Sequence, residues 1–350
     1  MQRYFIGPLL VILGASLWAT DTLFRFPLIQ KLQAEQIVFI EHLIAFIFIL
    51  PFFLSDREKF KTINQAQWLG LTIVGIFGSA VSTILFTKSF LLIHPSVAIL
   101  LQKLQPLIVA LLAFLFLKER FSASFFLWAP LALVAAMILS FPNFEFLNWQ
   151  QFKNSPWEGT LFAVSAASLW ALATVFGKSL LKSIAPTVVT FWRFWFGLCF
   201  LIALQFFTFN PEMVPVFQNL SVWKSLAAMA LIPGLIAVWL YYQGLQRTQA
   251  TVTSFLELIF PIAATVINTY FLDLPLTMTQ LLAGALLLIA MIGINASQRR
   301  NKPIQKDSSS HQEDSKNEVE YPSKRSDEKT DLIDSDQASS STSSSPVAPG

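Results

Sequence analysis

The chain has little cysteine, little histidine and little charge. Its 350 residues include one cysteine (Cys199) and three histidines, and 13% are charged, against roughly 25% in an ordinary soluble domain. A single cysteine excludes an intrachain disulfide framework and a cysteine-based metal site. The histidines at positions 42, 94 and 311 are too scattered to suggest a metal cluster. We therefore expect no metal and no other cofactor.

Motifs for several other chemistries are absent as well. No G-x-x-x-x-G-K-[ST] segment occurs, so ATP-driven transport by this chain is not supported. No nucleophile–histidine–acid arrangement stands out, and no basic patch with aromatic residues suggests a nucleic-acid partner. The sequence thus disfavours both an enzyme and a nucleic-acid-binding protein.

Long hydrophobic runs dominate what is present. Hydrophobic residues make up 54% of the chain, and a helix that spans a bilayer needs about 20 mostly apolar residues. The first run is too long for a signal-peptide core and lacks a clear cleavage site, so we interpret it as a transmembrane helix. In total the runs predict ten transmembrane helices, at residues 5–27, 35–54, 67–90, 94–117, 121–141, 158–178, 185–208, 223–245, 250–271 and 275–296.

These helices fall into two copies of one five-helix unit. Residues 15–19 recur at 167–171, and residues 68–137 align without a gap with residues 223–292, at an offset of 155. An odd number of spans places the second copy upside down relative to the first. Many secondary transporters use such inverted repeats around a midplane site. We predict an all-α integral membrane protein of ten transmembrane helices, arranged as two inverted five-helix repeats.

Composition sets the boundaries of these units. We place the first repeat at residues 1–145, a linker at 146–157, the second repeat at 158–298 and a disordered cytoplasmic tail at 299–350. Residues 301–350 carry six Lys/Arg and ten Asp/Glu and are rich in serine. Such a segment cannot bury enough apolar surface to fold alone.

Positive charges predict the orientation in the cell membrane. If the N-terminus is cytoplasmic, most Lys and Arg residues fall in inside segments, and the outside loops hold little beyond Lys31, Lys153 and Lys224. Cytoplasmic loops of membrane proteins carry this excess of positive charge. We therefore predict that both termini are cytoplasmic.

The first helix carries a polar face. Trp18, Asp21, Thr22 and Arg25 follow the i, i+3, i+4, i+7 spacing of one side of a helix. Ionisable groups inside a span are energetically costly and usually face a cavity or one another. Two interpretations stay open: Asp21 and Arg25 pair within the helix, or the face lines a cavity.

Helices 2 and 4 add further polar groups. Glu41 and His42 lie in helix 2, and Gln102, Lys103 and Gln105 lie in the middle of helix 4. Lys103 needs a carboxylate partner, and helices 1 and 2 both offer one. A buried Glu41–Lys103 bridge would lock two helices together, whereas a substrate contact or a proton-titrating pair would mark a pathway.

The second copy repeats this pattern with different residues. Glu257 corresponds to Gln102, and each lies four residues before a proline, Pro261 and Pro106 respectively. Proline frees backbone carbonyls, which are tolerated at membrane depth only inside protein or beside a water-filled cavity. A simple kink is the alternative. Two further pairs of corresponding polar positions are Lys88 with Gln243 and His42 with Arg193.

Two basic residues of the second copy differ in depth. Lys178 lies at the end of helix 6, and we expect its amine to reach the membrane surface. Arg193 lies about eight residues into helix 7. Pairing of Arg193 with Glu257 or with a nearby carbonyl is an alternative to a substrate contact.

Part of the chain resembles a known family. Residues 86–120, in which Pro106 precedes an aliphatic run and then Glu119, resemble the EamA-type drug/metabolite transporters, and so do helices 6 and 7 with Arg193. The resemblance implies a ten-helix carrier with two inverted repeats, often an exporter of amino acids or other small metabolites. In the first copy, Glu41 and His42 stand where helix 2 of the family usually offers an arginine.

The sequence therefore predicts a secondary transporter of a small polar organic solute, such as an amino acid or a related metabolite, that works by alternating access. Lys103 and Arg193 would engage a carboxylate or phosphate, a buried carboxylate would face an amine or titrate a proton, and two tryptophans would form the walls. The candidate substrate contacts are Trp18, Asp21, Glu41, His42, Lys88, Gln102, Lys103, Gln105, Trp170, Arg193, Gln243 and Glu257.

A membrane-embedded scaffold or interaction protein without transport is the alternative function. Such a scaffold should tolerate loss of the midplane charges. The partners that we expect are a small-molecule substrate, the lipid bilayer and, as a coupling ion, the proton; the sequence leaves the solute, the direction of transport, proton coupling and the oligomeric state open.

Overall fold

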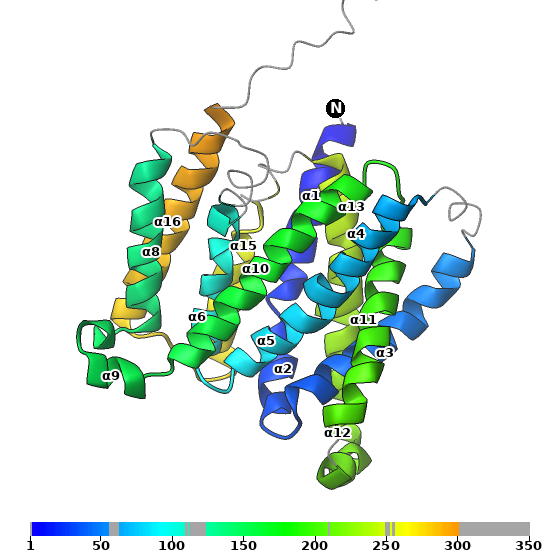
Figure 1. The fold of residues 1–350 in the computed structure, drawn as a ribbon, viewed down its shortest axis with the longest axis horizontal. Coiled ribbons are helices and arrows are strands. Elements are labelled where there is room, and N and C mark those ends of the chain that lie inside the picture. The colour runs from blue at the N-terminus through cyan, green and yellow to red at the C-terminus, as the bar shows by residue number, and fades with distance from the viewer. Residues whose placement is uncertain are drawn as a thin grey trace, which may run out of the picture. The chain divides into compact units, whose positions relative to one another are not determined.

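Every regular element that the structure describes is a helix (Figure 1). The computed structural model describes residues 2–55, 63–108, 111, 124–208, 211–248, 253 and 256–300. Six spans in this part are long and apolar enough to cross a membrane: Ile6–Ile29, Ala34–Leu54, Gln65–Ser89, Trp157–Leu180, Pro186–Thr208 and Leu220–Arg247. Three shorter apolar helices, Phe125–Ser140, Ile259–Phe271 and Met278–Ile294, accompany them. The protein is a multi-pass membrane protein.

The first span is divided, where the sequence predicted one helix at 5–27. Two residues, Ala19 and Thr20, separate α1 (Gln2–Trp18) from α2 (Asp21–Ile29). Between them Thr20 donates its backbone N–H to the Leu17 carbonyl at 3.1 Å and its hydroxyl to the same oxygen at 2.8 Å. This tightened turn puts Asp21 in the first turn of a new helix, where the helix dipole favours a negative charge.

The second and third spans begin with reciprocal caps. α3 (Ala34–Leu54) starts after Gln33, which exchanges hydrogen bonds with Gln36, and α4 (Gln65–Gly75) starts after Asn64, which does the same with Gln67. These capping boxes satisfy backbone N–H groups that a helix start otherwise leaves unpaired. The third span continues from α4 through η2 (Ile76–Val81) into α5 (Ser82–Ser89).

The predicted helices 4 and 9 are described in part. α6 (Pro95–Leu101) tightens into η3 (Gln102–Leu104), and α15 (Ile259–Phe271) represents the ninth helix. Glu119 and the rest of the predicted helix 4 beyond residue 111 lie outside the described residues. The fifth helix is α8 (Phe125–Ser140), and the predicted linker contains η4 (Glu145–Leu147) and α9 (Trp149–Asn154).

The remaining elements follow the predicted order. They are α10 (Trp157–Leu180), α11 (Pro186–Thr208), η5 (Pro211–Gln218), α12 (Leu220–Met229), η6 (Ala230–Ile236), α13 (Ala237–Arg247) and α16 (Met278–Arg300). α16 extends four residues beyond the predicted end of helix 10, at residue 296, and so includes the first two residues of the predicted tail. Residues 301–350 of that tail lie outside the described residues.

Two spans contain a π-helix at the same position of the repeat. η2 occupies residues 76–81 and η6 occupies residues 230–236, and the offset of 155 maps Ile76 onto Leu231. A π-helix is rare and is often found at a functional site. Both π-helices lie in the interior of a long span rather than at its end.

Helices from the two halves of the chain pack in matched pairs. α1 lies against α13 and α5 against α10, while α3 packs on α11, α6 on α15 and α8 on α16 (Figure 1). Glycine permits the close approach of α3, α4 and α11. A Cβ on Gly197 would lie 2.8 Å from His42 Cδ2 and 3.1 Å from the Gly75 carbonyl oxygen. Small residues at such contacts let membrane helices approach closely.

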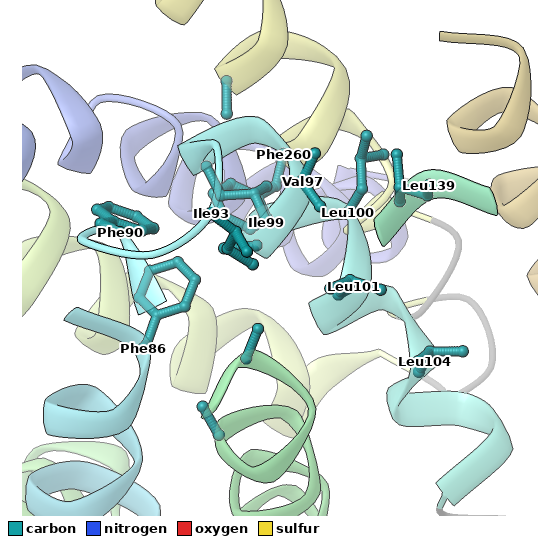
Figure 2. Packing of buried hydrophobic residues seen from close by; sticks show 14 of the residues in the cluster. Phe86, Phe90, Ile93, Val97, Ile99, Leu100, Leu101, Leu104, Leu139 and Phe260 are labelled. Carbon is teal, nitrogen blue, oxygen red and sulfur yellow. The ribbon is translucent and has the colours of Figure 1, made fainter. Parts of the chain in front are cut away.

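Apolar side chains fill the spaces between these helices and also cover their outside. Figure 2 shows part of the main cluster, in which the rings of Phe86 and Phe90 lie edge to face with centroids 4.7 Å apart. On α11, Phe206 is 84% exposed and Phe207 is 88% exposed. Large aromatic residues at such exposure fit a hydrocarbon surrounding better than water.

Candidate functional site

A cavity of about 160 Å³ lies where the two halves of the chain meet. From the first half it is lined by Trp18, Asp21, Arg25, Glu41, His42, Ser79, Thr83, Phe86, Gln102, Lys103 and Gln105. From the second half it is lined by Trp170, Ala173, Thr174, Arg193, Phe194, Pro233, Gly234, Val238, Tyr241, Tyr242, Glu257 and Phe260. These residues come from the predicted helices 1 to 4 and 6 to 9, whereas α8 and α16 pair with each other and contribute none of the lining.

An ionic cluster fixes the first half of the lining. Arg25 donates from Nε to Asp21 at 2.6 Å, and its Nη2 reaches both Asp21 at 2.8 Å and Glu41 at 2.9 Å. Its Nη1 donates to the Thr87 hydroxyl at 3.0 Å. The side chains of Arg25 and Glu41 are 3% and 8% exposed. One guanidinium therefore holds α2, α3 and α5 together. Of the predicted polar face, Asp21 and Arg25 pair within the helix and also line the cavity, whereas Thr22 lies outside the lining.

A second ion pair joins the halves. Lys103 Nζ lies 3.8 Å from Glu257 Oε2, and the other carboxylate oxygen accepts a 2.8 Å hydrogen bond from the Tyr241 hydroxyl. The Lys103 ammonium also lies 5.0 Å from the centre of the Phe260 ring, within the range of a cation–π contact. Of the alternatives left open for Lys103, the Glu41–Lys103 bridge is not found, because Glu41 pairs with Arg25 and Lys103 pairs with a carboxylate of the second half.

Arg193 and His42 line the cavity between the π-helix η2 and α13. Arg193 donates from Nη2 to the Gly78 carbonyl at 2.6 Å and from Nη1 to the Tyr242 hydroxyl at 3.2 Å. His42 has both ring nitrogens engaged, Nδ1 with the Val38 carbonyl and Nε2 with the Ser79 hydroxyl, each at 2.9 Å. Of the two structural alternatives for Arg193, the carbonyl is the one found.

Aromatic rings form two pairs in the lining, each of which we call a wall. The rings of Trp18 and Tyr241 have centroids 4.9 Å apart, and those of Trp170 and Phe86 have centroids 5.1 Å apart. The two pairs are related by the repeat, since Trp170 corresponds to Trp18 and Tyr241 corresponds to Phe86. Each wall thus combines a tryptophan from one half with an aromatic ring from the other.

The charges of the lining balance. Among the described residues that line the cavity there are three carboxylates (Asp21, Glu41 and Glu257) and three cations (Arg25, Lys103 and Arg193). Five of these six groups are in direct ion pairs. Arg25 pairs with two carboxylates, which leaves one negative charge in excess, and the positive charge of Arg193 brings the sum for these six groups to zero. Among the residues that the structure describes, no group of three or more His, Cys, Asp or Glu side chains could hold a metal ion.

Ten of the twelve predicted contacts lie in this lining, and two lie elsewhere. Lys88 is 39% exposed and forms a 2.5 Å ion pair with Glu35 at the start of α3. Gln243 accepts a 2.6 Å hydrogen bond from Arg247 on the same helix. Lys178, near the end of α10, is half-buried and donates to the Leu245 and Thr248 carbonyls at 2.5 and 3.1 Å, at the end of α13.

The predicted list of substrate contacts left out Arg25, although the predicted polar face of helix 1 included it, and sequence reasoning missed both tyrosines. The repeat itself contains the signal that could have found Tyr241, because Phe86 and Tyr241 are equivalent and both face the cavity. The same holds for Ser79 with Gly234 and for Thr83 with Val238, which are too small or too apolar to stand out inside a span.

A membrane-embedded helical bundle around a cavity with charged and aromatic lining residues is an architecture of solute transporters, and comparison with known proteins gives the family. The EamA-like transporter family matches twice, at residues 5–141 and 157–296. The chain belongs to this family and is a transporter rather than an enzyme.

Individual relatives add detail. The chain is 32% identical over 305 residues to the riboflavin transporter ImpX of Fusobacterium nucleatum subsp. nucleatum, with 84% of this chain and 99% of that protein covered. It is 24% identical over 233 residues to the uncharacterised transporter YyaM of Bacillus subtilis, with 65% and 72% covered. A crystal structure of 18% identity shares the fold, with a TM-score of 0.56 over 86% of this chain and 99% of that one.

Proposed function

We propose that this protein is a secondary transporter of a small polar organic solute in the cell membrane, and that the solute carries no net charge. The single observation that supports this most is the cavity, which both halves line at corresponding positions (79/234, 83/238, 86/241, 102/257 and 105/260). A cavity of that kind gives each half an equivalent surface to open and close, which alternating access around one site requires.

The transporter that we propose has ten transmembrane helices in two inverted repeats, at residues 1–145 and 158–298. A linker at 146–157 joins the repeats, and a cytoplasmic tail follows at 299–350. The double match to the family supports it, and so does the pairing of helices between the halves. The distribution of Lys and Arg supports a cytoplasmic location for both termini.

The ion pairs favour an uncharged solute over an amino acid. The carboxylates that would face an amine are occupied by Arg25 and Lys103. A solute with a free amine would have to break one of these buried pairs to reach a carboxylate, and a buried charge without its partner is costly. Aromatic walls and hydrogen-bonding groups suit a flat, uncharged ring with polar substituents.

Riboflavin is the candidate that we place first. It is an uncharged aromatic ring system with a polyhydroxyl chain, and the relative from Fusobacterium nucleatum is named as its transporter. An apolar cavity of about 150 Å³ holds benzene, so a three-ring solute requires the walls of this cavity to move apart. The proposal therefore includes a more open state than the one described.

Uptake into proteoliposomes tests the proposal. We expect the wild type to accumulate radiolabelled riboflavin, and Lys103→Gln, which leaves Glu257 unpaired in the cavity, to lose most of that flux. The matched control is Lys224→Gln, an exposed lysine on α12 outside the lining, which should transport normally. Repeating the assay with and without a pH gradient decides whether protons are coupled.

Two outcomes would contradict the proposal. Flux of amino acids but not of riboflavin would show that the solute class is wrong while transport is right. Absence of flux for riboflavin, amino acids, nucleobases and organic cations, from protein shown to be folded, would favour the membrane scaffold.

A further inference from the structure

Most polar groups of the cavity already satisfy one another, and two atoms stand apart. The side-chain oxygen of Gln102 and the Nε–H of Arg193 are buried and have no hydrogen-bond partner among the described residues. Both residues line the cavity, Gln102 from the first half and Arg193 from the second. A buried donor or acceptor that is left unpaired is destabilising, so a bound solute that satisfies both gains a specific advantage.

The Arg193 side chain is held in place by the protein. Both of its terminal nitrogens already donate, one to the Gly78 carbonyl at 2.6 Å and the other to the Tyr242 hydroxyl at 3.2 Å. The Nε–H is the buried Arg193 donor nitrogen that has no partner among the described residues. A carboxylate prefers the fork of two parallel N–H groups, and one nitrogen of that fork already donates to the Gly78 carbonyl.

We propose that Gln102 and Arg193 together recognise an imide edge, in which a ring N–H stands beside a ring carbonyl. The Gln102 oxygen accepts from the ring N–H, and the Arg193 Nε–H donates to the adjacent carbonyl. The pyrimidinedione end of riboflavin carries this edge at its N3–H, as do thymine and uracil. The inference rests on the proposed function and names the two side chains that select the solute.

The position of both groups fits this role. Gln102 begins the tightened turn η3, whose Lys103 is fixed by Glu257. Arg193 is anchored on the π-helix η2. Groups that are fixed before the solute arrives lose little freedom on binding, so their hydrogen bonds discriminate well. A site built to hydrogen-bond a substrate N–H strongly rejects the analogue that lacks it.

The first test changes the solute and leaves the protein intact. Binding of riboflavin and of N3-methylriboflavin to purified wild-type protein is measured by the quenching of flavin fluorescence. We expect N3-methylriboflavin to bind about tenfold or more weakly, because its methyl group removes the donor and leaves the Gln102 oxygen unpaired. Equal binding of the two flavins would overturn the inference.

The second test assigns the preference to a side chain. Gln102→Leu should bind riboflavin more weakly and lose the preference for riboflavin over its N3-methyl form, whereas Gln150→Leu, at an exposed glutamine on α9 outside the lining, should keep that preference. Arg193→Lys keeps the positive charge but lacks the Nε–H, and it should weaken the binding of riboflavin by about tenfold. A Gln102→Leu protein that still prefers riboflavin would contradict the proposed contact.

The two proposals fail in different ways. If the wild type does not bind riboflavin at all, the proposed solute is wrong, and the comparison is repeated with thymine and 3-methylthymine. A preference for thymine over 3-methylthymine would then support recognition of an imide edge in another solute. The lack of any preference would overturn the inference.

Discussion

The two halves of the cavity have the same outline and different chemistry. In the first half, Asp21 and Arg25 belong to a buried ionic cluster, and the corresponding residues of the second half are Ala173 and Gly177. In the reverse direction, Gln102 of the first half corresponds to the carboxylate Glu257 of the second.

This difference separates what the repeat supplies from what the solute requires. Helix pairing, the π-helices and the aromatic walls occur in both halves, so they belong to the scaffold. The charges occur at single positions, so the two ends of a bound solute meet different groups. A symmetric scaffold can therefore hold an asymmetric molecule in one orientation.

The largest effect is expected from Arg25→Met. Asp21 and Glu41 would then share a buried site without a counter-charge, and breaking such a buried pair costs about 3–5 kcal/mol. Thermal unfolding in detergent should show a large loss of stability and a low yield of folded protein. The triple variant Asp21→Asn, Arg25→Met, Glu41→Gln should recover most of it, because the second half does without ions at these positions. If Arg25→Met were as stable as the wild type, the ionic cluster of the first half would not differ in its energetic role from the uncharged positions of the second half.

Glu257→Gln should reduce transport by about tenfold or more, since Lys103 would remain in the cavity without its partner, and an unpaired buried charge is costly. Initial rates in proteoliposomes measure this. The double variant Lys103→Gln, Glu257→Gln separates two roles. Partial recovery would mean that the pair serves mainly to neutralise itself, and no recovery would mean that one of the two groups also contacts the solute.

Gly197→Ala tests whether close packing of α3, α4 and α11 matters. Its new Cβ would lie 2.8 Å from His42 Cδ2, which forces a shift, and overpacking of this kind costs about 1–3 kcal/mol. Gly177→Ala is the matched control, because its Cβ would meet nothing closer than the Tyr242 hydroxyl at 3.7 Å. Melting temperatures should fall for the first variant and stay level or rise for the second.

The smallest effect is expected from Lys88→Met. The Lys88–Glu35 pair is partly exposed, and exposed pairs contribute about 0–1 kcal/mol. Because Lys88 lies outside the lining, the affinity for the solute should not change, and Gln243→Met at the corresponding position should behave alike. A clear rise in the Kd of either variant would restore the role in binding that the sequence suggested.

Depth in the membrane predicted most of the charged lining residues, and it failed at Lys88. Lys103, Arg193 and Glu257 were predicted because few ionisable residues occur inside the spans, and these three line the cavity. Lys88 was predicted to contact the solute because it lies inside a span, but it lies outside the lining. Phe86, two residues earlier, faces the cavity, and two residues turn an α-helix by about 200°, so Lys88 lies on the opposite side of the helix.

The pairing of the charges could not be read from the sequence, because it depends on distances between helices. The break at Ala19 and Thr20 begins a new helix at Asp21, and Arg25 then reaches Glu41 from α2. Nothing in the spacing of Trp18, Asp21 and Arg25 indicates that break. With Glu41 occupied, Lys103 turns to a carboxylate from the other half of the chain.

The π-helices determine which residues can face the solute at all. Removing one residue from Ile76–Val81 would let the span continue as a regular α-helix, and every later side chain would turn by about 100° around the helix axis. Thr83 and Phe86 would then leave the cavity, although neither had been changed. The same argument applies to Ala230–Ile236, with Val238 and Tyr241. The length of backbone ahead of these residues is thus as much a part of the binding surface as the side chains themselves.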